Sequence, residues 1–388
     1  MNTSLSTMNS SVATKCLLIV SLVVMALSVN AELAVETPTT KTLPKKPGAH
    51  WMWVSDLNFY SMESGRAYLI DGDSGQMKGS LSTGYFWASA INASDYSVIY
   101  SPETYLSRGT RGERVDIIAI YDPQTLAPVD EIIIPPKRFS GVPVTGHSSL
   151  SSDDRFMAVF NFTPAQSVSI IDVKAKKFVT EVETPGCAQV FQAGARAFNM
   201  ICGDGTMLTL MLDDDGAVTT KRSEQFYDAK KDLVDDKMSQ YGTSWLYFSK
   251  SGMVHQVEMA SGEPEFKTPW PLFTDGQKAD SWMAGGYQYA SVHESSGELY
   301  VLVHRGGEFT HKNPGMDVWV YDIASKKRKR MISLSHPATA INVTQDNEPQ
   351  LFTADAEHSG VVIYNASTGE HLHDVGEVGV NPLLFWTP

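Results

Sequence analysis

The chain has 388 residues, a formal net charge of −13, 42% hydrophobic residues and 19% charged residues. This composition supports a sizeable apolar core and therefore excludes wholesale disorder. Because an acidic chain repels phosphate backbones, the charge also argues against a nucleic-acid-binding protein. The length allows two domains or one large repeat fold.

The first thirty residues have the features of an export signal. Lys15 precedes an apolar run over residues 17–29, and residues 29–31 offer small side chains for cleavage. The run is too short for a comfortable membrane span, and no later stretch approaches about 18 apolar residues. We expect residues 1–31 to be a signal peptide cleaved near Ala31, and we expect no membrane span in the mature chain.

Residues 32–50 are polar and contain three prolines, so we expect an N-terminal arm before a domain that spans residues 51–388. Two cysteines, Cys187 and Cys202, remain once the signal peptide is removed. An even pair in an exported chain indicates a disulfide, which would close a loop of about 15 residues and contribute roughly 3 kcal/mol. Two buried free thiols are the alternative.

One pattern recurs beyond residue 50. A short β-branched or aromatic run ends in an acidic or amide residue, and a turn and a second run come next, which predicts a hairpin with a capped turn. Copies at intervals of roughly 40–65 residues, with other strand-like runs between them, are typical of propeller blades. The sequence therefore predicts an all-β fold, a seven-bladed β-propeller, from seven strand ends: Asp71, Asp122, Asp172, Asp213, Glu258, Asp322 and Asn365.

The two ends of the predicted ring are both strand-like. Pairing residues 51–54 with residues 383–386 would close the ring and remove two exposed sheet edges. The one competing helical signal is a short helix predicted around residues 227–238.

The usual catalytic motifs are absent, including G-x-S-x-G, H-E-x-x-H and C-x-x-C. Residues 71–75 resemble a calcium loop but lack its twelfth-position carboxylate, so a hairpin turn is favoured. His371 and His373 share a strand face without a visible third ligand, which favours solvent-exposed histidines over a metal site. The basic run at residues 326–330 is interpreted as a solvated sheet edge, with a docking patch as the alternative.

Several segments, taken in order, resemble one protein family. Residues 110–116 (TRGERVD) resemble the T/A-R-G-x-R-x-D stretch in heavy subunits of the tryptophan tryptophylquinone amine dehydrogenases. Ala284 stands where the family usually has proline. The resemblance spans roughly residues 50–385, and its further segments are PPKRF at 135–139, the cysteine flanks at 186–187 and 200–205, WMAGGY at 282–287 and THK at 310–312.

The resemblance implies the large subunit of a periplasmic α2β2 quinoprotein amine dehydrogenase. Such an enzyme oxidises primary amines to aldehydes, here with aromatic amines favoured over methylamine, and passes electrons to a small blue copper protein. The tryptophan tryptophylquinone cofactor would belong to a cysteine-rich light subunit, so this chain would bind no cofactor or metal and carry no catalytic residue. The chain has too few cysteines to be that light subunit.

One residue role comes from the same resemblance. Phe59 aligns with a phenylalanine that lines the substrate entry, and ordinary packing is the alternative. Two other functional classes stay open. One is a secreted propeller binding module without catalysis of its own. The other is a self-contained propeller hydrolase, which needs acidic or histidine ligands converging on the central channel.

Overall fold

The computed structural model describes residues 41–87, 89–141 and 144–388. The predicted signal peptide and residues 32–40 of the predicted arm lie outside the described residues. Contacts between residues group Thr42–Pro388 into one compact unit. Within the described part of the chain, no helix is both long and apolar enough to cross a membrane.

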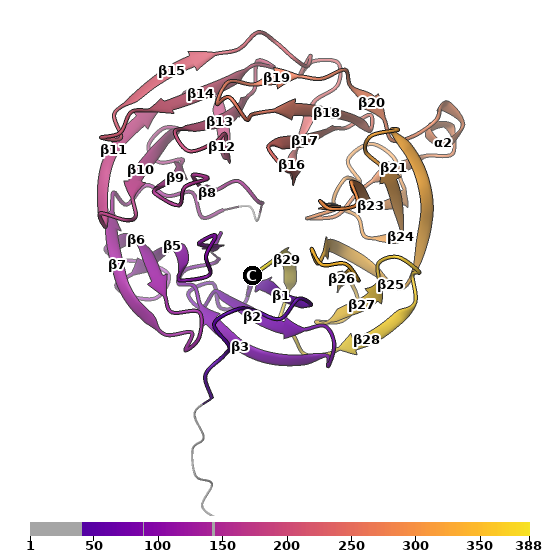
Figure 1. Ribbon diagram of the computed structural model, residues 1–388, viewed down its shortest axis with the longest axis horizontal. Helices are drawn as coiled ribbons and strands as arrows, with labels where there is room; N and C mark the ends of the chain where they lie inside the picture. Colours follow the sequence, from indigo (N-terminus) through magenta and orange to yellow (C-terminus); the bar gives the residue numbers. More distant parts are fainter. Residues whose placement is uncertain (1–40, 88, 142–143) are drawn as a thin grey trace, which may run out of the picture. The chain divides into compact units, whose positions relative to one another are not determined.

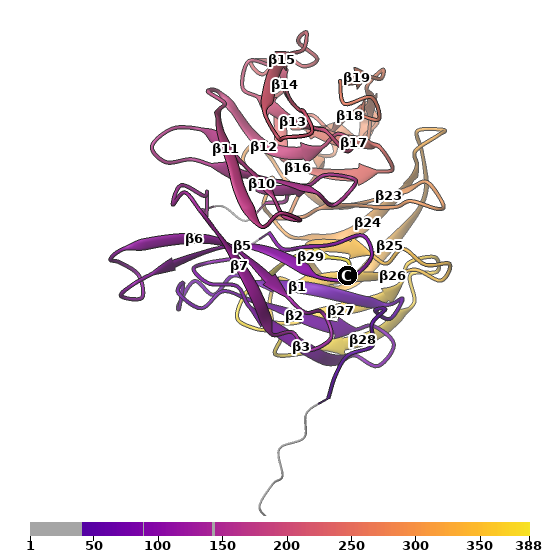
Figure 2. The same ribbon diagram turned by 60° about the vertical axis from the view of Figure 1, so that its left-hand side comes forward.

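Antiparallel sheets are arranged in a ring (Figures 1 and 2). Five of the sheets are separate blades of four or five strands. In sheet order their strands are β29 (Pro382–Trp386), β1 (Trp51–Asp56), β2 (Arg66–Asp71), β3 (Gln76–Ser82); β4 (Ile91–Asn92), β5 (Ile99–Leu106), β6 (Arg114–Tyr121), β7 (Pro128–Ile134); β8 (Ser148–Leu150), β9 (Phe156–Asn161), β10 (Ser167–Asp172), β11 (Lys177–Glu183); β12 (Cys187–Gln192), β13 (Ala197–Cys202), β14 (Met207–Leu212), β15 (Val218–Arg222); and β16 (Val234–Tyr241), β17 (Ser244–Ser249), β18 (Met253–Glu258), β19 (Glu265–Phe266), β20 (Trp270–Pro271).

The rest of the ring is one eight-stranded sheet, so the prediction of seven blades is wrong. The cause is β25, which is 17 residues long and pairs with β24 along its first part and with β26 along its last part. Residues 327–343 contain no glycine, and the strand continues through an irregular register at residues 334–337, where a blade boundary was expected. The strands of this sheet are β21 (Trp282–Ala284), β22 (Ala290–His293), β23 (Glu298–Arg305), β24 (Gly315–Asp322), β25 (Lys327–Val343), β26 (Gln350–Asp355), β27 (Val361–Asn365) and β28 (His371–Val375).

The seven predicted hairpins are confirmed, because each predicted strand end closes an antiparallel pair. In the first hairpin, the Asp71 carboxylate accepts hydrogen bonds from the Asp73 amide (3.1 Å) and the Ser74 hydroxyl (2.9 Å). This is the turn that resembles a calcium loop, and the Asp71 carboxylate is hydrogen-bonded within the turn. The prediction failed because it assigned each hairpin to a sheet of its own.

The predicted pairing of the two chain ends is also confirmed. β1 pairs antiparallel with β29, so that Trp53 lies opposite Trp386 and Val54 lies opposite Phe385. The two tryptophan rings stack with centroids 4.9 Å apart, and the Trp386 indole N–H donates to the Ser55 hydroxyl. One blade therefore contains strands from both ends of the chain.

The helix predicted around residues 227–238 is wrong. Turns occupy the first part of this segment and β16 begins at Val234. Tyr227, Val234 and Met238 have helix-like spacing, but they reach one apolar cluster from a loop and a strand. Among the described residues the helix is α2 (Asp275–Ala279), which begins with a capping box formed by Thr274 and Gln277.

The apolar core lies mainly between neighbouring sheets, where side chains of adjacent blades interdigitate. Ile118 of β6 and Met157 of β9, for example, share one buried cluster. The cysteines belong to this buried layer. Cys187 begins β12, Cys202 ends β13, and the two lie opposite each other in the register, joined by a disulfide. The structure thus has the bridge rather than two free thiols.

His50 links the last residue before β1 to the eight-stranded sheet. Its Nδ1 is 2.5 Å from the Asp73 carboxylate, and its Nε2 is 3.0 Å from the Asp346 carboxylate. Burial lowers the His50 pKa, but the hydrogen bonds and charges of Asp73 and Asp346 outweigh burial and raise the pKa above 6.5. Asp73 lies in the β2–β3 turn and Asp346 in the β25–β26 turn, so the histidine joins the closing blade to its neighbour.

We predict that this contact stabilises the fold more at about pH 6 than at about pH 8.5. A histidine whose pKa is raised on folding contributes fully below its unfolded pKa, and the contribution is lost as pH rises through the folded pKa. Thermal melts should therefore show that His50→Gln destabilises the protein more at the lower pH. In an Asp346→Asn background, the destabilisation caused by His50→Gln should differ less between the two pH values. Equal destabilisation by His50→Gln at both pH values would contradict the prediction.

Candidate partner-binding face

Large apolar side chains are exposed in the loops at one end of the sheets. We call this set the aromatic face. Phe59 is 50% exposed, Tyr60 is 91% exposed and Phe309 is 76% exposed. The full set is Phe59, Tyr60, Tyr105, Phe162, Leu233 and Phe309.

The topology places these residues at the same end. In antiparallel sheets, alternate connections lie at the same end, and each member of the set is in or beside a loop such as β1–β2, β9–β10 or β23–β24. The other exposed large hydrophobic side chains of the described residues lie within strands, as Tyr105 does near the end of β5, and two of them, Val115 and Met316, adjoin the β5–β6 and β23–β24 loops. They are Met77, Val115, Val129, Ile133, Met211, Met316 and Met331. The exposed apolar side chains that lie in loops are therefore at one end of the sheets.

Phe59 is presented by a tight turn after β1. The Asn58 side-chain oxygen accepts hydrogen bonds from the Tyr60 amide (3.2 Å) and the Ser61 amide (3.0 Å), which fixes the turn. The Phe59 ring rests against buried Phe86, with ring centroids 5.5 Å apart. Half of the ring packs and half is exposed, so the predicted channel role stays a prediction beside the packing alternative.

A buried charge cluster lies beneath this face, and it joins two of the segments singled out in the sequence. The Asp116 carboxylate is fully buried. It accepts hydrogen bonds from Nε and Nη2 of Arg114, both at 2.8 Å, and from the Arg138 backbone amide at 2.8 Å. The Thr104 hydroxyl donates to the same carboxylate at 2.9 Å and accepts from Arg138 Nε at 3.1 Å. The TRGERVD and PPKRF segments therefore meet at one carboxylate.

Arg138 connects this cluster to the aromatic face. Its guanidinium donates to the Trp87 carbonyl at 3.4–3.5 Å, and Trp87 comes directly after the Phe86 that supports Phe59. Burial lowers the Arg138 pKa to about 10, so the group stays protonated at neutral pH. A buried charge with several hydrogen bonds fixes the surrounding backbone, because any displacement leaves the charge unpaired.

His147 lies between two rings of the same region. Its imidazole is 5.3 Å from the Trp87 ring and 4.8 Å from the Phe139 ring, measured between centroids. Burial, together with the nearby Arg138 charge, lowers the His147 pKa to about 3, and neither ring nitrogen has a hydrogen-bond partner among the described residues. The residue is therefore neutral, and it packs as an aromatic ring.

A cleft of about 410 Å³ adjoins His147 at the same end of the sheets. Its apolar wall includes Phe139, Phe160 and Phe162, and its polar side includes Asp235 and Asp236. Lys237, which is 4% exposed, pairs with both carboxylates, and the Tyr289 hydroxyl donates to Asp235 at 3.2 Å. The cleft suits an aromatic side chain better than it suits catalysis, because its carboxylates are already paired.

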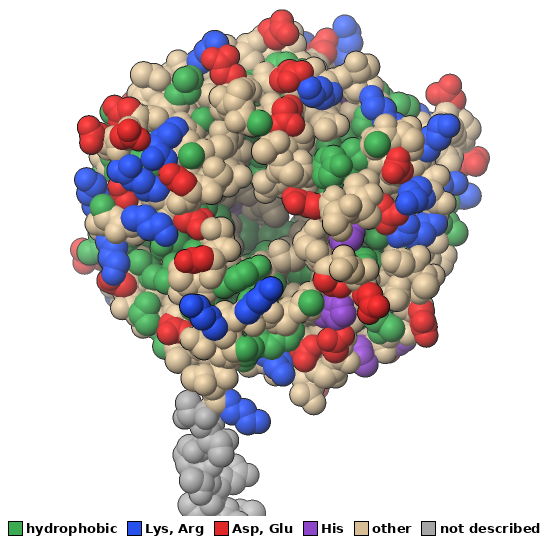
Figure 3. All heavy atoms as spheres, in the orientation of Figure 1, with side chains coloured by type: hydrophobic (Ala, Val, Ile, Leu, Met, Phe, Trp, Pro, Cys, Tyr) green, Lys and Arg blue, Asp and Glu red, His purple; other side chains and the backbone are tan. Residues whose placement is uncertain are grey.

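A cavity of about 600 Å³ lies in the central channel, and Figure 3 shows the hollow at the centre of the ring. Its walls are mostly serine, amide and apolar side chains, such as Ser148, Asn342 and Leu384. Asp154 is the single carboxylate among the described lining residues, and no histidine is among them. The part of the channel that the structure describes thus lacks the ligand set that a self-contained propeller hydrolase needs.

Two other segments from the sequence also meet in space. The Gly286 amide, in WMAGGY, donates to the His311 carbonyl, in THK, at 3.0 Å. Gly286 has φ = +128°, and a Cβ there would lie 2.5 Å from the Thr339 carbonyl oxygen, so glycine is required. The Lys312 ammonium lies over the Tyr287 ring at 5.8 Å. TRGERVD contacts PPKRF, and WMAGGY contacts THK, so each pair of segments forms one structural unit at this end of the sheets.

The remaining sequence candidates have local partners. His371 pairs with Asp374 at 2.8 Å and His373 with the Asp73 carbonyl at 2.9 Å, both on β28. Within the basic run, Arg330 forms a bidentate pair with Glu298 and Arg328 covers the Trp319 ring. These contacts fit a sheet edge. Among the described residues, the group of side chains that can hold a metal is His336, Glu357 and His358, which the sequence analysis missed.

Sequence reasoning also missed the aromatic face and the role of Arg138. The signal for the face was present, because Phe59, Tyr60, Phe162 and Phe309 all fall between predicted strands rather than within them. The signal for Arg138 was weaker. An arginine 22 residues after Asp116 shows no pairing until the fold brings the two segments together.

The comparisons with known proteins agree with the quoted segments. The family model "Methylamine dehydrogenase heavy chain (MADH)" matches residues 48–387. The methylamine dehydrogenase heavy chain of Methylobacillus flagellatus is 29% identical over 357 residues, which cover 90% of this chain and 89% of that relative. The heavy chain of Methylophilus methylotrophus is 30% identical over 336 residues, which cover 86% and 82% of the two chains.

Solved structures share the fold at low identity. Apo AztD from Citrobacter koseri has a TM-score of 0.51 and 12% identity, covering 86% of this chain and 97% of that chain. Dihydro-heme d1 dehydrogenase NirN, in complex with DHE, has a TM-score of 0.50 and 16% identity, covering 89% and 66%. At these identities the likeness concerns the fold alone.

We predict that Asp116→Ala destabilises the protein by about 3–5 kcal/mol, because it removes a buried carboxylate that pairs with Arg114 and accepts hydrogen bonds from the Arg138 amide and the Thr104 hydroxyl. Asp130→Ala is the matched control, since Asp130 is an exposed strand carboxylate paired with Lys176, and its loss should cost less than about 1 kcal/mol. Urea unfolding of the two variants and the wild type measures the difference. Similar midpoints for both variants would show that the cluster does not stabilise the fold.

Proposed function

Because the chain belongs to the methylamine dehydrogenase heavy chain family, we propose that it is the large subunit of an exported quinoprotein amine dehydrogenase and binds a cysteine-rich light subunit in an α2β2 assembly. The observation that carries this proposal is the one-sided aromatic face. Phe59 and Phe309 are exposed on loops that a buried charge cluster and sheet ends hold in place. Such rings at a surface are typical of protein interfaces.

The expected cofactor is tryptophan tryptophylquinone, and the tryptophans of this chain do not fit it. Two pairs of indoles are in contact, Trp53 with Trp386 and Trp282 with Trp319. Trp53 and Trp319 are each 2% exposed, so an amine cannot reach a carbonyl placed on them. We therefore assign the quinone to the light subunit, where it would supply the electrophilic carbonyl and electron sink that ordinary side chains lack.

This chain would contribute binding, orientation and exclusion of water. Phe59, supported by Phe86, would set the size and shape of the substrate entry once the light subunit covers the aromatic face. The aromatic surroundings favour an arylalkylamine over methylamine, because a ring on the substrate can stack where a methyl group cannot. The net charge of −13 favours approach of a cationic amine.

Location and electron acceptor complete the proposal. The disulfide between Cys187 and Cys202 fits the oxidising periplasm, and the predicted signal peptide would direct the chain there. A small blue copper protein would accept the electrons from the assembled enzyme. The competing function is a secreted propeller binding module that acts without a light subunit.

We predict that Phe59→Ala changes amine selectivity in the assembled enzyme. An aromatic ring at an entry contributes shape rather than proton transfer, so the relative kcat/KM for phenylethylamine and methylamine should shift by about 1–3 kcal/mol. Phe309→Ala is the matched control, because Phe309 is an exposed ring of the same face on the β23–β24 loop. Equal loss of activity with both amines, or no change, would support the packing role of Phe59.

We predict that the chain alone does not oxidise amines. Dye reduction with phenylethylamine should appear only when the chain is exported together with its light subunit, and the two should co-purify in high salt. An obligate interface of this type commonly exceeds about 2,000 Å² and is largely apolar. Turnover by the pure single chain would contradict the scaffold role, and failure of any cysteine-rich chain to co-purify would favour the binding module.

A further inference from the structure

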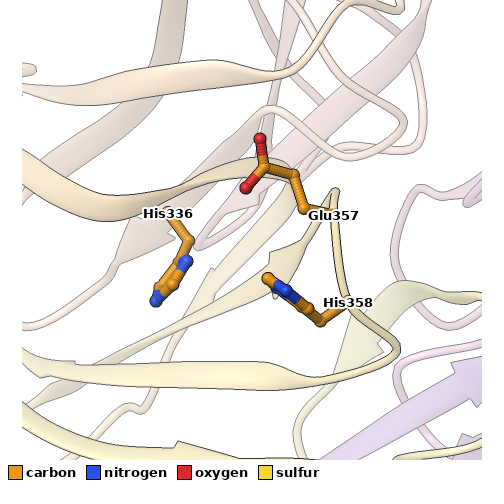
Figure 4. A group of neighbouring side chains, drawn as sticks. All are labelled: His336, Glu357 and His358. Atoms are coloured by element: carbon orange, nitrogen blue, oxygen red, sulfur yellow. The ribbon is translucent and has the colours of Figure 1, made fainter.

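The bend in the middle of β25 and the turn between β26 and β27 bring two histidines and a carboxylate together. His336 lies at the bend, and Glu357 and His358 lie in the turn. One potential ligand atom from each residue lies within 4.8 Å of the other two. Figure 4 shows the two imidazole rings on opposite sides of a gap, with the Glu357 carboxylate above it.

The backbone around this cluster is held by hydrogen bonds. The Ala356 amide donates to the Pro337 carbonyl at 2.8 Å, which ties the turn directly to the bend. The Asp355 carboxylate accepts from the Glu357 amide at 2.8 Å and the His358 amide at 3.2 Å, which shapes the turn. The Ser359 hydroxyl donates to the Val380 carbonyl at 2.8 Å and joins the turn to the next loop. Both ligand-bearing segments are therefore fixed before any ion binds.

Asp355 also orients the His358 imidazole. Its side chain is 6% exposed, and Oδ2 lies 3.0 Å from His358 Nδ1 and 3.8 Å from His336 Nδ1. A carboxylate that receives one ring N–H leaves the other nitrogen free to bind a metal, which is the usual arrangement behind zinc-bound histidines. The side chains of His336 and His358 are 37% and 69% exposed, so an ion in solution can reach them.

From this geometry we propose that His336, His358 and Glu357 bind one divalent transition-metal ion of the zinc type, with Asp355 orienting His358 and water completing the coordination. Two imidazole nitrogens and a carboxylate oxygen form a donor set that suits zinc and disfavours calcium and magnesium. Tetrahedral ligands at about 2.1 Å from zinc lie about 3.4 Å apart, so the ligand atoms, which lie within 4.8 Å of one another, need to close by at most about 1.4 Å. Rotation of exposed side chains allows this adjustment. The proposal rests on the ligand geometry alone, and its test does not depend on amine oxidation.

The chain contains a natural control for the site. His371 and Asp374 on β28 form an exposed histidine–carboxylate pair, 2.8 Å apart and three residues apart in sequence, as His358 and Asp355 do. This pair belongs to no group of three potential ligands among the described residues. If metal bound to exposed histidines non-specifically, replacing His371 and replacing His358 should weaken Zn²⁺ binding equally.

The test is isothermal titration of Zn²⁺ into the full chain, purified without a polyhistidine tag and treated with a chelator. We expect one Zn²⁺ per chain and no binding of Ca²⁺ or Mg²⁺. His336→Ala and His358→Ala should each weaken Zn²⁺ binding by at least about tenfold, and Glu357→Gln should weaken it to a lesser degree. His371→Ala should leave the affinity and the stoichiometry unchanged.

Melting temperatures of all four variants, measured without metal, show whether each variant folds. The exposed His358 should be replaced without loss of structure, so it decides the test if His336→Ala unfolds. The absence of a stoichiometric zinc site in the wild type would overturn the proposal. Equal weakening by His371→Ala and His358→Ala would overturn it as well.

Discussion

Closure of the ring is the constraint on which the rest of this fold depends. Each sheet buries its faces against its two neighbours, so an open ring would expose two complete sheet faces to water. The pairing of β1 with β29 and the stacking of Trp53 on Trp386 prevent this. His50 adds a polar contact at the adjoining seam, between carboxylates of two different turns.

A closed ring also holds loops from distant parts of the chain at one end, where the aromatic face forms. What fixes those loops differs from what fixes the sheets. Beneath Phe59 and Trp87 the support is a buried carboxylate, Asp116, with two arginines, and its hydrogen bonds give directional restraint that apolar packing does not. The two segments that supply these charges, both of which resemble family motifs, form one structural unit.

The sequence was sufficient for the features that local patterns encode. Hairpins such as that at Asp71 were predictable, because a strand end and a turn are adjacent in sequence and the capping carboxylate is part of the pattern. Closure by residues 51–54 and 383–386 was predictable from two strand-like ends. The number of separate sheets was not predictable, because it depends on whether β25 bends or breaks near Pro337, and backbone hydrogen bonds to β24 and β26 decide this. The cluster of His336 and His358 was missed for the same reason, since 21 intervening residues separate the histidines until β26 returns the chain to the bend.

The continuous eight-stranded sheet has a consequence for how the ring moves. Between separate blades, neighbouring sheets are joined by side-chain packing and a connecting loop, so they can shift slightly past each other. At β25, one continuous strand is hydrogen-bonded to β24 along its first part and to β26 along its last part. Movement of these two strands relative to each other would therefore require breaking backbone hydrogen bonds to β25. Slow fluctuations that widen the central channel will therefore be concentrated at the five-blade arc, while the backbone amides of β24–β27 exchange with solvent as one cooperative unit. Stiffness is thus unevenly distributed around the ring, and the β26–β27 turn lies on its stiffest part.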